Sequence, residues 1–269
     1  MLLAIRHETT YAFSQSVWHS IRLLRLTPRA HDGQTVREWQ IVTTPFRPLA
    51  SYVDGFGNVT HSHTITEPHE RTTITVSGLV ETSDTAGVLR GADEPLPTGV
   101  YLRRTPLTMP EGPVVDLAAA AGRAAGVERL HRLLGLVHER VAYRAGVTEV
   151  TTTAAQALEA GAGVCQDHAH VFLAAARALG IPTRYVGGYL STGDGEGEDQ
   201  ASHAWAEAYD PDLGWVGFDP ANGVCPDERY VRTSVGLDYI SAAPIRGVRH
   251  GLGEEHLSVV VAVTRVPQQ

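Results

Sequence analysis

The feature that most constrains the fold of this chain is a glycine-rich turn. It leads into a cysteine at the start of an amphipathic helical segment. The turn covers residues 161–164, Cys165 follows it, and the helical pattern runs to residue 179 before glycine and proline at 180–182 stop it. Unpaired backbone N–H groups and the positive end of the helix dipole meet at such a start and favour a thiolate over a thiol. The sequence therefore predicts a nucleophilic thiol at a helix N-terminus, and we expect the glycines of the turn to leave room for a substrate backbone.

Length and composition indicate a globular protein that works in the cytoplasm. The 269 residues, 43% hydrophobic and 19% charged, suffice for one large domain or two of ordinary size. No apolar run is long enough to span a membrane, and no basic flank marks a signal peptide at the start. We therefore expect Cys165 and Cys225 to be free thiols in a reducing compartment. The net charge of −8, without a Lys/Arg cluster, argues against a nucleic-acid partner.

The N-terminal third has the two-residue alternation of half-buried strands. Strands are expected at residues 2–13, 36–43, 59–66 and 71–80. A glycine-containing turn at 54–58 suits a tight reversal, so residues 1–84 are predicted to form a small antiparallel β-sandwich domain. We interpret Arg22, Arg25 and Arg29 as the exposed side of an element, and no group of residues in this domain demands chemistry.

A change of composition separates this domain from the rest of the chain. Residues 85–112 are rich in glycine and proline and are expected to be a linker, and residues 113–269 are expected to form a catalytic core with a C-terminal strand. Apolar residues three and four apart predict helices at 114–125 and 127–143. Thr153 and Gln156 fit a capping box for a short helix that ends at Gly161.

Short aromatic strands follow the cysteine-bearing helix. They are expected at residues 183–190, 202–209 and 214–218. The glycine- and carboxylate-rich loop at 191–201 is either a solvated hairpin tip or a cover for the site beside it. The apolar strand at 257–266 either closes the core sheet or returns to the N-terminal sandwich.

The two strands after this loop carry the partners that a thiolate nucleophile needs. His203 begins one of them, and imidazole can both accept and return a proton near pH 7. Asp219 ends the next strand, so it can reach the imidazole and fix its tautomer if the two strands are neighbours. Cys165, His203 and Asp219 thus follow the logic of a papain-like catalytic triad.

The segments that carry these three residues resemble the core of the bacterial transglutaminase-like superfamily of cysteine peptidases. They are residues 163–167, 179–189, 202–205 and 214–223. The N-terminal pattern, with His7, Tyr11, the Leu24–Arg29 stretch and the turn at 54–58, is similar to the β domain that precedes this core in many bacterial members. The resemblance implies an α+β fold in which a β-sandwich precedes a papain-like core of helices packed on an antiparallel sheet. It also implies a thioester intermediate on Cys165, with no cofactor and no metal.

Two positions depart from the family pattern, and four residues are pocket candidates. His168 stands where an aromatic such as Phe or Tyr is expected, and Ala221 stands where Thr is usual. The backbone N–H of Cys165 is a natural oxyanion donor at a helix start. A second donor is expected from Gln166 or from Tyr143. His168 and Trp205 are further candidates for the pocket wall.

Several residues also have plainer interpretations. An arbitrary cysteine is usually a small buried hydrophobe, and Cys225 has no partner motif. Cys165, His168, His170 and His203 together would be a zinc set, but their spacing does not place the helical residues on one face. Asp167 suits the first helical turn electrostatically, and His170 fits a packed histidine.

The function that follows from the triad is acyl transfer at an amide of a peptide or protein. Water as the second nucleophile makes the protein a peptidase or amidase, which we favour because relatives of this kind resemble proteases as a group. An amine acceptor makes it a transglutaminase or an amide-forming enzyme. A binding module that keeps the fold without chemistry is the third alternative, and a missing triad member would mark it.

Overall fold

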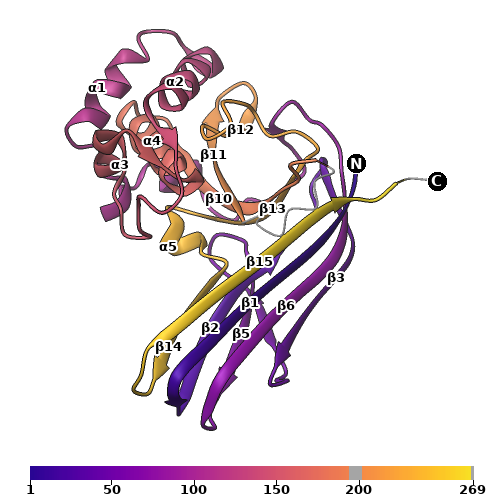
Figure 1. Cartoon of the computed structure of the whole chain (residues 1–269). Helices are drawn as coiled ribbons and strands as arrows, with labels where there is room; N and C mark the ends of the chain where they lie inside the picture. The colour runs from indigo at the N-terminus through magenta and orange to yellow at the C-terminus, as the bar shows by residue number, and fades with distance from the viewer. Residues whose placement is uncertain (194–201, 268–269) are drawn as a thin grey trace.

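A computed structural model describes residues 1–193 and 202–267 and has an α+β architecture (Figure 1). The strands are β1 (Leu2–Val17), β2 (His19–Thr27), β3 (Gln34–Thr44), β4 (Ala50–Val53), β5 (Val59–Ile65), β6 (His69–Thr82), β7 (Val88–Leu89), β8 (Ala142–Tyr143), β9 (Ala162–Gly163), β10 (Thr183–Leu190), β11 (His203–Asp210), β12 (Gly214–Phe218), β13 (Tyr230–Gly236), β14 (Ile245–His250) and β15 (Glu255–Arg265). The helices are α1 (Pro113–Ala120), α2 (Gly126–Arg140), α3 (Ala154–Ala160), α4 (Cys165–Ala178) and α5 (Tyr239–Ala242), with 3₁₀ turns η1 (Thr98–Leu102) and η2 (Pro106–Thr108). None of the helices in these described ranges is long and apolar enough to cross a membrane.

The N-terminal strands form the predicted β-sandwich. Its two four-stranded antiparallel sheets have the orders β15-β1-β6-β3 and β14-β2-β5-β4. Side chains of β1 alternate between the interior and the surface, with Leu3, Ile5 and His7 all buried. This alternation is the two-residue period that the sequence predicts.

The expectation that Arg22 lies on an exposed face is wrong. Arg22 shares its strand face with Leu24 and Leu26, because residues two apart in a strand point the same way. All three are buried in the sandwich, and the Arg22 guanidinium lies 4.3 Å from the centre of the Tyr11 ring. A cation–π contact of this kind partly compensates the charge for its loss of water.

The C-terminal strand returns to the sandwich rather than closing the core sheet. β15 pairs with β1 along its whole length, from Leu3 opposite Arg265 to Phe13 opposite Glu255, and β14 pairs with β2. The two chain ends therefore lie at the same end of the sandwich (Figure 1). Of the two alternatives for the C-terminal strand, the structure therefore has the return to the N-terminal sandwich.

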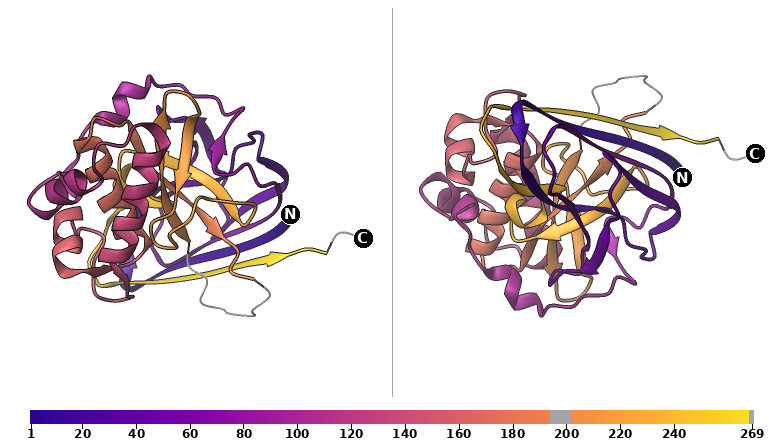
Figure 2. Two further views of the ribbon diagram at one scale, coloured as in Figure 1. Left: turned by 90° about the horizontal axis from the view of Figure 1, so that it is seen from above. Right: turned by 90° about the horizontal axis from the view of Figure 1, so that it is seen from below.

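The core is a five-stranded antiparallel sheet with helices on one face. Its order is β13-β10-β11-β12-β7, and α4 packs on β10 and β11 while α1, α2 and α3 surround it. Ala204, Ala206 and Ala208 of β11 belong to the apolar cluster beneath α4. Small side chains there let the helix approach the sheet closely. Views from above and below show these helices gathered on one side of the molecule (Figure 2).

The segment 85–112, expected to be a linker, packs against this sheet. β7 pairs with β12, and Tyr101 is fully buried with its ring edge-on to Trp215 at 5.1 Å. Glu94 forms an ion pair with the buried guanidinium of Arg184 on β10. Aromatic burial and this ion pair fix the segment in place even though its sequence has little periodicity.

Two helices end earlier than the sequence predicts, and the first of them, predicted for 114–125, ends at Ala120. Thr153 and Gln156 form the expected capping box of α3, which ends at Gly161 in a left-handed conformation. The helix predicted for 127–143 ends earlier, at Arg140. The chain becomes extended there because β8 pairs in parallel with β9, the two-residue strand that leads to Cys165.

Candidate active site

The start of helix α4 is organised by a buried carboxylate. Asp167 accepts hydrogen bonds from the backbone N–H of Val164 at 2.8 Å and from the Thr148 hydroxyl at 2.7 Å. A Cβ on Gly163 would lie only 2.6 Å from this carboxylate, so a side chain there would disrupt the cap. Gly163 therefore makes room for Asp167, and the expectation that the glycines of this turn leave room for a substrate stays a prediction.

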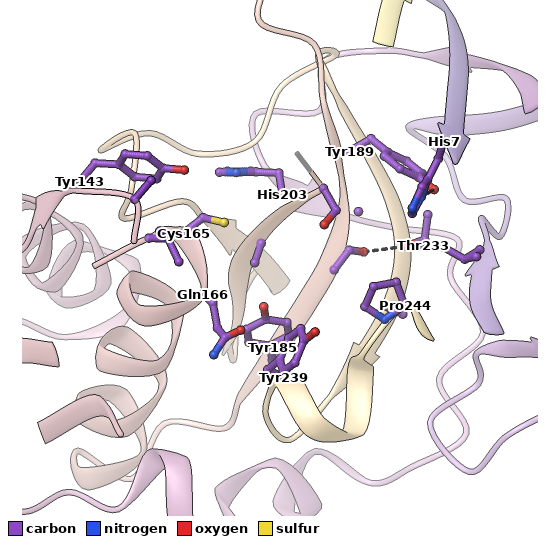
Figure 3. A pocket seen from close by; sticks show the side chains of 18 residues that line it. His7, Tyr143, Cys165, Gln166, Tyr185, Tyr189, His203, Thr233, Tyr239 and Pro244 are labelled. Carbon is purple, nitrogen blue, oxygen red and sulfur yellow. Dashed lines mark hydrogen bonds between the residues drawn. The ribbon is translucent and has the colours of Figure 1, made fainter. Parts of the chain in front are cut away.

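Adjacent strands bring His203 and Asp219 together. β11 and β12 pair antiparallel, and His203 Nε2 lies 2.7 Å from Asp219 Oδ2. Figure 3 shows the His203 ring beside the sulfur of Cys165. Nδ1 is the ring nitrogen left to face Cys165, because Asp219 engages Nε2. The imidazole therefore lies between the thiol and the buried carboxylate.

Asp219 is held by five donors. Besides His203, its carboxylate accepts from the Tyr230 hydroxyl and the Asn222 amide, each at 2.7 Å. The backbone N–H groups of Ala221 and Asn222 complete the set at 3.0 and 3.3 Å. Burial acts to raise the pKa of Asp219, but these hydrogen bonds and the charge of His203 hold it below its usual value. Since Ala221 contributes its backbone N–H, the departure from Thr keeps this contact.

The same partners favour a charged imidazole at His203. Burial acts to lower the pKa of His203, but hydrogen bonds to Asp219 and Cys165, and the charges of both, raise it to about 10. The indole of Trp205 stacks against the imidazole, with ring centres 6.3 Å apart and planes at 24°. The imidazole is thus fixed in position and prepared to donate a proton at neutral pH.

Of the four pocket candidates, two line the cavity beside Cys165 and two lie behind it. Tyr143 and Gln166 are in the cavity wall. Trp205 is buried behind His203. His168 is also buried, with its ring nitrogens 2.9 and 2.7 Å from the carbonyl oxygens of Val164 and Val141, and it stacks on Tyr143.

The cavity extends well beyond the residues expected from the sequence. It measures about 330 Å³ and runs from Cys165 to the sandwich. Several residues that the sequence did not indicate as pocket residues line it, among them His7, Leu26, Tyr185, Tyr189 and Tyr239. The alternation in β1, β2 and β10 predicts which of their side chains share a face. It does not predict that these faces meet at one cavity.

The remaining candidates lie outside this cavity. His170 is buried beneath it, where its Nε2 accepts from the backbone N–H of Tyr239 at 3.1 Å and burial lowers its pKa to about 4. Cys225 is free and half-buried, and burial raises the pKa of its thiol. In the described ranges no group of three or more potential ligands could hold a metal ion, and the ring nitrogens of His168 both face carbonyl oxygens.

Part of the predicted loop beside the site, residues 194–201, lies outside the described residues. The expectation that the loop 191–201 covers the site therefore stays a prediction. In the described part, a thiol at a helix start meets an imidazole that a buried carboxylate orients. Such an arrangement can attack a carbonyl carbon and protonate the group that leaves.

Matches to two protein families and to one relative together cover nearly the whole chain. Residues 115–220 match the transglutaminase-like superfamily, and residues 3–81 match the bacterial transglutaminase-like N-terminal region. An uncharacterized protein of Mycobacterium leprae is 32% identical over 287 residues, which cover 98% of this chain and 99% of that relative.

Two further comparisons concern proteins whose names state an activity. A protein-glutamine gamma-glutamyltransferase of Pseudomonas aeruginosa is 31% identical over 101 residues, or 33% of this chain and 15% of that relative. The solved structure of a proposed cysteine protease from Cytophaga hutchinsonii has a TM-score of 0.77 at 21% identity and covers 100% of this chain and 92% of that one. The structural likeness concerns the fold, whereas the two family matches and the full-length Mycobacterium leprae relative show that the chain belongs to the transglutaminase-like superfamily, in the form with a bacterial transglutaminase-like N-terminal region.

Proposed function

We propose that the protein hydrolyses an amide bond of a peptide or protein through a thioester on Cys165. The observation that carries this proposal is the position of the His203 imidazole, which lies beside Cys165 and is hydrogen-bonded to the buried Asp219. The pKa of about 10 for His203 keeps its imidazole protonated at neutral pH. The imidazole is then in the protonation state needed to give a proton to a leaving amine.

The reaction proceeds in two halves. The thiolate attacks the carbonyl carbon, the tetrahedral intermediate collapses, and the imidazolium of His203 gives its proton to the departing amine. This leaves a thioester and a neutral imidazole. The imidazole then removes a proton from water, whose oxygen attacks the thioester carbonyl, and the products are a carboxylic acid and regenerated Cys165. Asp219 keeps the imidazole oriented throughout and stabilises its charged form.

Tyr143 is our choice for the second oxyanion donor, beside the backbone N–H of Cys165. Burial, and then the charge of Cys165, raise the pKa of the Tyr143 phenol, so its hydroxyl remains a donor at neutral pH. The side-chain amide of Gln166 already donates to the Val150 carbonyl at 3.3 Å. The phenol is therefore the freer of the two candidates.

Hydrolysis fits the surroundings of the thiol better than amine transfer. Tyr143 at the mouth of the cavity is 58% exposed, so water can reach a thioester there. No Asp or Glu is among the described residues that line the cavity, so none of them offers a counter-charge to a lysine-like acceptor. Amine transfer is the second candidate, because the Pseudomonas aeruginosa relative is named a protein-glutamine gamma-glutamyltransferase.

A single incubation separates these candidates. Casein is treated with the protein in the presence and absence of a labelled primary amine, with Cys165→Ala as the control. New N-termini that depend on Cys165 support hydrolysis, and incorporation of the amine supports transfer. Casein that binds unchanged, without a thioester detectable by intact mass, would refute both and leave the binding module.

A further inference from the structure

We propose that the β-sandwich forms the inner wall of an acyl-donor pocket that selects an uncharged, largely apolar side chain next to the carbonyl under attack. This inference rests on the proposed function for the identity of the reacting group. It goes beyond that function because it names the substrate class and gives the N-terminal region a part in recognition.

The cavity joins two regions that are far apart in sequence. One end holds Cys165 and His203, and the opposite end holds His7 of β1, Leu26 of β2 and Pro244, which precedes β14. Figure 3 shows His7 and Pro244 on the far side of the cavity from the Cys165 sulfur. Since all three inner residues lie in sandwich strands or immediately before one, the core alone does not complete this wall.

The wall carries no permanent charge beyond the reacting groups. Among the described residues that line the cavity, none is Lys, Arg, Asp or Glu. Burial lowers the pKa of His7 to about 4, so its ring is neutral at pH 7. Burial also raises the pKa values of Tyr185 and Tyr239, so both phenols stay uncharged. A charged side chain that entered this space would lose its hydration without gaining a counter-ion.

Most polar groups of the inner wall are already satisfied. His7 hydrogen-bonds to the Tyr189 hydroxyl at 2.9 Å and to the Thr9 hydroxyl at 2.8 Å. The hydroxyl of Thr233 donates to the Gly187 carbonyl at 2.9 Å. These groups therefore present mainly carbon surface to the cavity, which favours an apolar occupant.

Two hydroxyls remain for a neutral polar contact. The Tyr185 and Tyr239 side chains both line the cavity, and Figure 3 shows their hydroxyls side by side below Cys165. They can bind a peptide group of the acyl donor while its side chain lies against Leu26 and Pro244. The volume of about 330 Å³ is enough for such a residue and its flanking peptide group.

The test compares acyl donors that differ mainly in charge. N-acetyl thiobenzyl esters of norleucine, lysine and glutamate are mixed with the protein, and acylation of Cys165 is followed by intact mass. We expect the norleucine ester to acylate Cys165 at least 100-fold faster than either charged ester at pH 7. Rates within threefold of one another would overturn the inference.

A pair of variants tests whether the sandwich side of the cavity is responsible. Pro244→Glu adds a carboxylate to the inner wall, whereas Val248→Glu adds the same charge on β14 at a side chain that is 73% exposed. Pro244→Glu should raise the rate of the lysine ester relative to the norleucine ester at least tenfold, and Val248→Glu should not change the ratio. Identical ratios in the two folded variants would rule out this wall as the selecting surface.

A protection experiment distinguishes an error in the proposed pocket from an error in the proposed reaction. The N-acetyl amides of the same three residues are tested for slowing the alkylation of Cys165 by iodoacetamide, which requires no turnover. Protection by the norleucine amide alone supports the pocket even if no thioester forms. A thioester from all three esters, without selective protection, would keep the reaction and overturn the pocket.

Discussion

Replacement of Asp219 by Asn is the sharpest test of the proposed triad, because it changes a charge and almost no volume. The rise in the His203 pKa from 6.5 to about 10 corresponds to roughly 5 kcal/mol in favour of the imidazolium. His203 is only 11% exposed, so solvent screens this interaction little. Asp219 is the larger of the two causes that raise this pKa, so loss of its carboxylate should remove about 2–3 kcal/mol, or a factor of roughly 30 to 150.

The substitution should also change the tautomer of the imidazole. The amide of an Asn at this position presents an N–H toward His203 Nε2, which then accepts and leaves its proton on Nδ1, the nitrogen that faces Cys165. A proton there prevents the ring from accepting one from the thiol. A smaller fraction of His203 is then protonated. In the neutral ring, the nitrogen that faces Cys165 is a donor instead of an acceptor, which is the wrong tautomer for a triad of this kind.

Alkylation of Cys165 by iodoacetamide between pH 5 and 10 measures this effect without a substrate. Between pH 6 and 8 we expect Asp219→Asn to slow the reaction of Cys165 by 10- to 100-fold, with recovery above pH 9 as hydroxide removes the thiol proton directly. Cys225 is the internal reference, since burial raises the pKa of its thiol and should keep it slow. In the wild-type protein, equal rates for the two cysteines at pH 7 would contradict the activated thiolate.

The matched control is Asp227→Asn, which makes the same change at a partly exposed carboxylate paired with Arg229. It should leave the rate at Cys165 unchanged. Peptide mapping reports each cysteine separately, and thermal unfolding verifies that both variants fold. If folded Asp219→Asn protein reacts within twofold of wild type across the whole pH range, the charge of Asp219 has no part in activating Cys165.

Three further predictions concern groups in and around the proposed triad. Tyr143→Phe should slow acylation of Cys165 by a thioester donor about 100-fold while its alkylation by iodoacetamide stays the same, and a parallel loss of both would argue against an oxyanion role. His168→Phe removes the hydrogen bond to the Val141 carbonyl and should lower the free energy of unfolding by about 1–3 kcal/mol in urea titrations; unchanged stability would contradict that reasoning. Because the pKa of His203 is raised in the folded state, its contribution to stability should be complete below pH 6.5 and disappear as the pH rises through about 10, and His203→Gln should lack this dependence in the same titrations.

The proximity of Cys165, His203 and Asp219 could be predicted because its signals are local. A helix start after a glycine turn locates Cys165, and a short connection between two strands makes them neighbours, which brings Asp219 near His203. The cap formed by Thr153 is likewise a signal within one turn. Each of these depends on residues that are close in the chain, where propensity and hydrogen bonding decide the conformation.

Strand partners could not be predicted in the same way. The alternation in residues 257–266 predicts a strand, and only the structure shows that it pairs with β1 rather than with the core sheet. β13 pairs with β10, although β11 and β12 lie between them in the chain and no hairpin connects them. The prediction for Arg22 is wrong for a related reason. In this run of arginines and leucines, either set of alternate residues could face the interior, and only the structure shows that the set with Arg22 does.

The part of the cavity that we propose to bind the acyl donor depends entirely on such long-range pairing. The hydrogen bond between His7 and Tyr189 joins residues 182 positions apart, and it lies where the sandwich meets the core sheet. Nothing in the sequence near His7 indicates a pocket, because its neighbours Leu3 and Ile5 have the same buried alternation. The proposed reaction therefore depends on short segments around Cys165, whereas the proposed choice of substrate depends on the contact between two distant strands. Substitutions in the sandwich should thus change which acyl donor is accepted while leaving the alkylation of Cys165 intact.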